Sequence, residues 1–149
     1  MSVAPVTSGM AGSLSETYAA AIRHDQVALD GATPVGVVRR PPGWFHAQVE
    51  ENIRELGPPE ALLDETKERQ ADLDQAGKGE TAAHNAAFEE TDFAERYRTY
   101  LRDDPDARTA LEALADRVRA GEDVAVVCFE ADDKACHRHT LLEVLRTDL

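Results

Sequence analysis

Two valine-rich runs constrain the fold of this chain more than any other feature: "PVGVVRR" (34–40) and "VAVVCFE" (124–130). Both are continuously apolar instead of alternating, which is typical of strands covered on both faces. Pro34 stands at the first position of its run, where a strand tolerates proline. The chain between the runs has mostly helical spacing of its apolar side chains. Because strands separated by helices pair in parallel, we predict an α/β protein.

The predicted helices occupy most of the remaining chain. Their apolar side chains recur every three or four residues, as on one face of an amphipathic helix. These segments are "WFHAQVEENIREL" (44–56), "PPEALLDETKERQADL" (58–73), "DFAERYRTYL" (92–101), "DARTALEALADRVRAGED" (106–123) and a last helix marked by Leu141, Leu142 and Leu145. The stretch "DQAGKGETAAHN" (74–85) predicts a loop.

A third strand is needed, because two strands are too few for a stable sheet. The candidate is "TYAAAIRHD" (17–25). Its alanines, and the capping-box pattern of Ser13 and Glu16 before it, favour a helix, whereas completion of the sheet favours a strand. We predict a strand. The expected fold is a single small α/β domain over residues 15–149, with a short, mostly parallel sheet of about three strands flanked by helices, after a disordered tail over 1–14.

The charge balance bears on which partners the protein can have. The chain has 29 acidic and 16 basic residues, a net charge of −13, and the acids are spread over almost every segment. This distribution indicates a halophilic, solvated acidic surface more than a site for a cationic partner. Acidity disfavours nucleic-acid binding, but the Debye length of about 3 Å in molar salt weakens that argument. A nucleic-acid partner is therefore conceivable but unsupported by charge.

The hydropathy pattern and the cysteine content bear on the compartment. No apolar stretch reaches the roughly 18 residues that a membrane helix needs, and the first residues lack the basic and apolar regions of a secretory signal. With two cysteines, we expect a cytoplasmic protein in which both cysteines remain thiols. The sequence does not indicate an oligomeric state.

Three stretches resemble the domain-of-unknown-function 488 family. The acidic composition resembles that of a haloarchaeal-type member of this family. The three stretches are "VGVVRRPPGW", "FEETDFAERYRTYL" and "VAVVCFEADDKACHRHTLLEVL", within residues 17–148. The family's second strand often carries an aspartate where this chain has Val37 and Val38. The resemblance implies an α/β fold and a set of site positions, but no reaction. Those positions are Arg39 or Arg40 with Pro41, Phe93 with Arg96 and Tyr97, Cys128 with Glu130, and Cys136-His137-Arg138.

A candidate catalytic group follows the second valine-rich strand. In parallel α/β sheets, ligands bind outside the carboxyl ends of the strands, so we expect Glu130, Cys136 and His137 to face a crevice there. The start of the last helix and the charge of Arg138 would favour a Cys136 thiolate, which makes Cys136 a candidate nucleophile or redox thiol. His137 is the candidate acid or base, and Glu130 could orient it. Alternatively, Cys136 packs as a small apolar residue and Glu130 pairs with Arg138 as a structural clamp.

The candidate ligand-binding residues are cationic or aromatic. Arg39, Arg40 and Arg138 could converge on an anion, because guanidinium groups bind phosphate oxygens in a bidentate way. Trp44 could stack on a ring at the mouth of the crevice. The alternatives are that Arg40 forms a surface salt bridge and that Trp44 covers the edge of the core.

Metal binding is the weakest interpretation of this cluster. Cys128, Cys136, His137 and His139 include the ligand types of zinc, but their spacing does not match a zinc finger, so we expect no metal and no other cofactor. Three functions remain open. They are an enzyme acting on a phosphate-bearing or nucleotide-like substrate, a nucleic-acid or nucleotide binding module without chemistry, and an accessory domain that binds another protein.

Overall fold

A parallel sheet forms the centre of the structure, which is a computed structural model that describes residues 12–24, 29, 31–128 and 136–148. In these ranges the sheet has four strands in the order β1-β4-β2-β3. The strands are β1 (Leu14–Tyr18), β2 (Thr33–Gly36), β3 (Glu51–Asn52) and β4 (Val124–Cys128). All three strand pairs are parallel. The predicted small α/β domain is confirmed, with one strand more than expected.

Strand β4 shows why the second valine-rich run predicted a buried strand. All five of its residues are buried. Val124 and Val126 pack into the larger core, while Val127 packs with Ala19 and Phe45 in a second, smaller cluster. Because neighbouring side chains of a strand point to opposite faces, both faces of β4 are covered.

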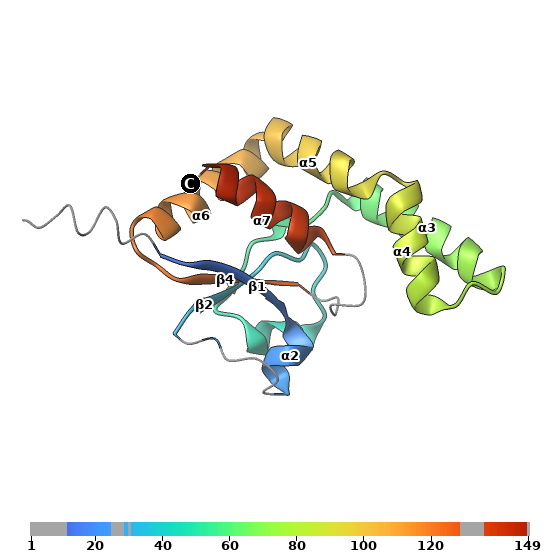
Figure 1. Ribbon diagram of the computed structural model, residues 1–149, viewed down its shortest axis with the longest axis horizontal. Coiled ribbons are helices and arrows are strands. Elements are labelled where there is room, and N and C mark those ends of the chain that lie inside the picture. The colour runs from blue at the N-terminus through green and yellow to red at the C-terminus, as the bar shows by residue number, and fades with distance from the viewer. Residues whose placement is uncertain (1–11, 25–28, 30, 129–135, 149) are drawn as a thin grey trace, which may run out of the picture.

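Helices lie on both faces of the sheet (Figure 1). They are α2 (Ala19–Arg23), α3 (Glu60–Gln75), α4 (Glu80–Glu90), α5 (Phe93–Asp103), α6 (Pro105–Arg119) and α7 (His137–Asp148), with short 3-10 helices η1 (Gly43–Gln48) and η2 (Arg54–Leu56). Helices α6 and α7 cover one face and α2 lies on the other, while the α3–α4 hairpin extends away from the sheet.

The predicted strand over 17–25 is correct only for Thr17 and Tyr18. Strand β1 ends at Tyr18, and helix α2 begins at the next residue, so the local helical signal and the demand of the sheet are each met over part of 17–25. The capping-box interpretation of Ser13 is wrong. Its backbone nitrogen and its hydroxyl oxygen lie 2.8 and 3.1 Å from Oδ1 of Asp123, a contact between β1 and the turn before β4. Of the expected tail, residues 1–11 lie outside the described residues.

The predicted helix over 44–56 is wrong, because tertiary pairing replaces it. The segment forms η1, then β3 beside β2, then η2. The side chain of Asn52 accepts a hydrogen bond from the Val38 N–H (3.0 Å) and donates one to the Val38 carbonyl (2.9 Å), which extends the pairing beyond the ends of the strands. The predicted loop over 74–85 is also too long, since α4 begins at Glu80.

Candidate functional site

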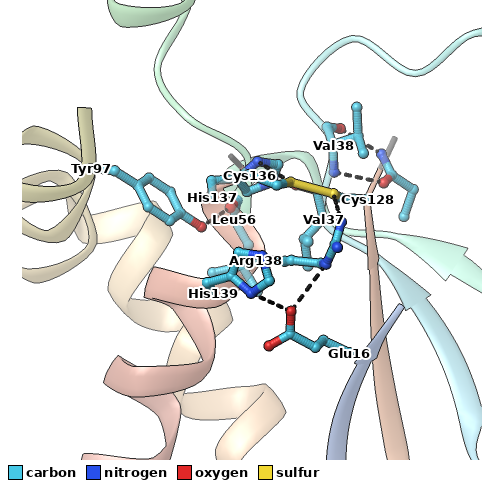
Figure 2. Close-up of a disulfide and its surroundings, with 11 residues drawn as sticks. Glu16, Val37, Val38, Leu56, Tyr97, Cys128, Cys136, His137, Arg138 and His139 are labelled. Carbon is cyan, nitrogen blue, oxygen red and sulfur yellow. Dashed lines mark hydrogen bonds and ion pairs between the residues drawn. A yellow bond between two sulfur atoms is a disulfide. The ribbon is translucent and has the colours of Figure 1, made fainter. Parts of the chain in front are cut away.

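The Cys-His-Arg triplet lies at the carboxyl ends of the strands, where β4 and the start of α7 meet (Figure 2). All three residues are buried, with exposed fractions of 4% for Cys136, 8% for His137 and 0% for Arg138. Their side chains have different neighbours. Cys136 and His137 contact each other and line a pocket, whereas Arg138 is turned away from that pocket.

Cys136 forms a disulfide with Cys128, the last residue of β4. The expectation that both cysteines remain thiols is therefore wrong for this structure. The two sulfurs meet because Cys128 ends β4 and Cys136 directly precedes α7, and both lie at the carboxyl end of the sheet. In the disulfide, Cys136 is neither a free nucleophile nor a small apolar residue packed on its own.

His137 is held between a backbone carbonyl and the disulfide. Its Nε2 is hydrogen-bonded to the carbonyl oxygen of Val37, and its Nδ1 lies 3.6 Å from Sγ of Cys136. Because a carbonyl only accepts, Nε2 carries the proton and the lone pair of Nδ1 faces the sulfur. Burial lowers the pKa of His137 to about 4, and the nearby positive charge of Arg138 acts in the same direction. The imidazole is neutral at pH 7.

Arg138 is turned toward β1 and β4. Its Nε lies 3.1 Å from Oε1 of Glu16, its Nη1 donates to Sγ of Cys128 at 2.8 Å, and its guanidinium lies over the Tyr18 ring, 5.7 Å from the centroid. Glu16 also pairs with Nδ1 of His139. Arg138 is thus a buried cation beside one sulfur of the disulfide. Glu130, its expected partner and a candidate catalytic residue, lies outside the described residues.

The three arginines expected to bind an anion do not converge. Arg39 donates to the carbonyls of Pro58 (3.1 Å) and Gly57 (3.2 Å) and to the hydroxyl of Tyr100 (2.7 Å). Arg40 is exposed and forms ion pairs with two acids of α3, Glu60 (3.2 Å) and Asp64 (2.9 Å). Its surface salt bridges agree with the alternative interpretation of this residue.

Arg39 and Arg40 nevertheless share a pocket with two residues of the triplet. This pocket has a volume of about 630 Å³ and lies between the end of β2, the α3–α4 hairpin and the start of α7. Its aromatic side chains Phe88 and Phe93 are stacked, with ring centroids 4.1 Å apart. Its lining includes Arg39, Arg40, Lys67, Phe88, Phe93, Cys136 and His137. Cations, aromatic rings, Cys136 and His137 therefore line one cavity.

A larger hollow of about 860 Å³ lies between α5, α6 and α7. It contains no residue of the triplet, and several of its charged side chains are paired. Arg98 binds Glu95 and Glu143, and Arg119 binds Asp116. We therefore take the smaller pocket, which contains the sulfur and the imidazole, as the candidate site.

Trp44 lies on the opposite face of the sheet from α7. It packs beside the cluster of Ala19, Phe45 and Val127, and the guanidinium of Arg23 lies 5.2 Å from its ring centroid. It does not line the pocket of Arg39 and Cys136. This position agrees with the alternative interpretation, in which Trp44 covers the edge of the core.

The aromatic helix α5 supports the site and contributes one residue to the pocket. Phe93 lines the pocket, whereas the buried Tyr97 donates its hydroxyl to the Leu56 carbonyl and packs edge-on against His137, with ring centroids 5.4 Å apart. Arg96 joins α5 to α3 through Glu65 at 2.8 Å. Through Tyr97, helix α5 therefore fixes the position of the His137 ring.

Sequence reasoning missed the residues that position the arginine turn. Asn52 binds the backbone of Val38, and Tyr100 accepts from Arg39. Gly57 is needed for the close approach of two segments, since a Cβ there would lie 2.4 Å from the backbone nitrogen of Arg39. The "GPP" turn of 57–59 was a visible signal for a special backbone position, but the polar roles of Asn52 and Tyr100 had no local signal.

Among the described residues, no group of three or more His, Cys, Asp or Glu side chains could hold a metal ion. Within the same ranges, no helix is both long enough and apolar enough to cross a bilayer.

A short, four-stranded parallel sheet with helices on both faces places this chain in the α/β class of proteins. The chain belongs to the domain-of-unknown-function 488 (DUF488) family. The family model DUF488-N3a, described as the active DUF488-N3 subclade, matches residues 18–149. Comparisons with curated proteins and with solved structures found no match.

Proposed function

We propose that the pocket binds an anionic ligand that carries a phosphate group and a ring, and that reduced Cys136 acts on this ligand as a nucleophile. One observation supports the proposal above the others. Arg39 and Arg40 line the same cavity of about 630 Å³ as Cys136 and His137. A cavity of this size suits a small molecule of nucleotide-like dimensions.

The ligand would use two kinds of lining residue. Arg40 keeps an exposed guanidinium at the rim, where its ion pairs with Glu60 and Asp64 are open to solvent and open to exchange for a phosphate. Lys67 adds a second cation from α3. The stacked rings of Phe88 and Phe93 offer an apolar wall for the ring of the ligand.

The chemistry would need the thiol form of Cys136. The lone pair of His137 Nδ1 lies 3.6 Å from the sulfur and is placed to accept the thiol proton, while Nε2–H stays bound to Val37. Tyr97 and Val37 fix the ring in this orientation. The thiolate formed in this way would point into the pocket that holds the ligand.

Calorimetry on the reduced protein tests the binding step, with adenosine monophosphate and inorganic phosphate as probes. We expect Arg40→Ala to weaken binding of the nucleotide about tenfold or more, because a charge-assisted contact is lost. The matched control is Arg69→Ala, which removes an exposed arginine of α3 that is paired with Glu90 outside the pocket. Equal affinity of Arg40→Ala and the wild type would contradict the proposal.

Alkylation of the reduced protein tests the chemical step. We expect iodoacetamide at pH 7 to modify Cys136 faster in the wild type than in His137→Gln, because only the wild type has the Nδ1 acceptor. Cys136→Ser should keep nucleotide binding and lose any turnover. An alkylation rate that is unchanged in His137→Gln would favour the second candidate, a non-catalytic nucleotide-binding module. The disulfide of Cys136 supports that candidate, because a disulfide-bonded cysteine is not a nucleophile.

A further inference from the structure

The two sulfurs of the disulfide have different surroundings (Figure 2). Cys136 lines the pocket and faces the lone pair of His137 Nδ1 at 3.6 Å. Cys128 is fully buried, does not line the pocket, and accepts from Nη1 of Arg138 at 2.8 Å. Cys136 therefore lies in the wall of the pocket, while a buried cation lies against the Cys128 sulfur.

We propose that Cys128 and Cys136 form a reversible thiol–disulfide exchange site for small-molecule thiols. Cys136 is the sulfur attacked from the pocket, and Cys128 is the leaving thiolate, which Arg138 stabilises. This inference uses the same pocket as the proposed function but needs neither an anionic ligand nor a nucleophilic reaction on it.

The exchange balances with two molecules of an external thiol. A thiolate RS⁻ attacks Sγ of Cys136, the Cys128–Cys136 bond breaks, and its electron pair goes to Sγ of Cys128. A second RS⁻ attacks the R sulfur of the mixed disulfide on Cys136 and releases RSSR and the Cys136 thiolate. The external thiol is oxidised to RSSR, and the protein disulfide is reduced to two thiol groups. The two external thiols release two protons, to solvent or to Nδ1 of His137, and the same number of protons converts the two protein thiolates to thiols.

Arg138 is placed to favour the reduced side of this couple. Its guanidinium has an exposed fraction of 0%, so its charge is poorly screened by water, and it already donates to the Cys128 sulfur. In the disulfide that sulfur is neutral; in the thiolate it gains a full charge, and the contact becomes a charge-assisted hydrogen bond. Glu16, 3.1 Å from Nε of Arg138, opposes the effect by neutralising part of the charge.

The chemistry of the cytoplasm agrees with a reversible couple. In that compartment, which the sequence predicts, disulfides are rare, and most of those that form are transient, catalytic or redox-sensing. A disulfide beside a cation and an imidazole, with one sulfur in a pocket, has the arrangement of an exchanging pair more than that of a structural cross-link.

The decisive experiment traps the mixed disulfide. Cys128→Ser and Cys136→Ser are each incubated with oxidised glutathione, without any phosphate ligand, and the adducts are quantified by mass spectrometry. We expect rapid glutathionylation of Cys136 in Cys128→Ser and at least about tenfold slower reaction of Cys128 in Cys136→Ser, because thiol exchange follows access. Equal rates, or faster reaction of Cys128, would overturn the assignment of roles.

Equilibration of the wild type in glutathione buffers tests the stabilisation by Arg138. We expect the protein to pass from disulfide to dithiol as the buffer becomes more reducing. Half-reduction of Arg138→Met should need a more reducing buffer than the wild type, and half-reduction of Glu16→Gln a less reducing one. Each change should be about tenfold in the buffer ratio. A disulfide that no buffer reduces, or shifts of the same sign in both variants, would refute the proposal. If Arg138→Met does not fold, the trapping experiment and Glu16→Gln still decide.

Discussion

At the scale of single residues, burial changed the chemistry expected from the Cys-His-Arg triplet. His137 is a neutral acceptor toward Cys136, because its Nε2–H donates to the Val37 carbonyl and burial disfavours the charged ring. Arg138 keeps its charge in a buried position by binding Glu16 and the Cys128 sulfur. Adjacent residues of one helix therefore act on different sulfurs of the same disulfide.

The lowered pKa of His137 predicts that the oxidised protein loses stability in mild acid. Between pH 6.5 and about 4 the unfolded chain binds a proton at this histidine and the folded protein does not, so the free energy of unfolding falls as the pH falls through this window. A shift from 6.5 to about 4 corresponds to about 3 kcal/mol over the whole window. Below about pH 4 both states are protonated, and this loss is complete.

Urea unfolding of the wild type and His137→Gln at a series of pH values measures the effect. We expect a clearly smaller pH dependence in the variant between pH 6.5 and 4.5. The carboxyls whose pKa is lowered by arginine partners, such as Asp64 and Glu65, also lose stabilising contacts as the pH falls, but equally in both proteins, so the difference between the two curves isolates His137. Parallel curves for the two proteins would mean that His137 is not held neutral by the fold.

At the scale of elements, helix α6 shows how local signals and packing agree. Asp104 caps it by accepting from the Ala107 N–H at 2.9 Å, and Pro105 occupies its first turn. Its buried residues Leu111, Leu114 and Val118 lie at helical spacing and pack into the larger core. The helix is therefore specified both by its start and by its apolar face.

Removal of the cap should have a small and measurable cost. We expect Asp104→Ala to lower the free energy of unfolding by about 1 kcal/mol, and Asp104→Asn to keep most of the stability, because asparagine also accepts from the helix start. Asp103→Ala, at the exposed neighbouring position, is the matched control and should change stability by less than about 0.5 kcal/mol. Equal losses for Asp103→Ala and Asp104→Ala in urea melts would exclude the capping role.

At the scale of the whole molecule, the excess of acids sets the response to salt. The surface has many Arg–carboxylate pairs, such as Arg98 with Glu143 and Arg117 with Glu122, and salt weakens such pairs. The net charge of −13 leaves far more acids than these pairs neutralise, so relief of repulsion should exceed the loss of attraction.

Thermal unfolding in increasing KCl tests this balance. We expect the melting temperature at pH 7 to rise with KCl into the molar range, as the Debye length falls from about 10 Å at 0.1 M to about 3 Å at 1 M. The control is the same titration near pH 4.7, the isoelectric point, where the rise should be much smaller. A melting temperature that is flat or falls with salt at pH 7 would return the acidic surface to the candidates for a functional site.

The sequence by itself determined the features that depend on neighbouring residues. The valine run of β4 and the spacing of Phe93, Tyr97 and Leu101 in α5 predicted buried elements, because periodicity records which side chains must leave water. The order of strands and helices predicted a parallel sheet, since parallel pairing requires such connections. The carboxyl ends of the strands followed as the expected place of the candidate site.

Only the tertiary structure decided which side chains meet. The disulfide joins Cys128 to Cys136, and Arg138 pairs with Glu16 across 122 positions of sequence. Asn52 binds the backbone of Val38, so its segment pairs with β2 where the sequence predicted a helix. Such contacts depend on chain segments that approach from far along the sequence, and their free energy outweighs local helix preferences of a few tenths of a kcal/mol per residue. The direction of each buried polar side chain is set by the partner that satisfies it, because an unpaired buried charge or donor is costly.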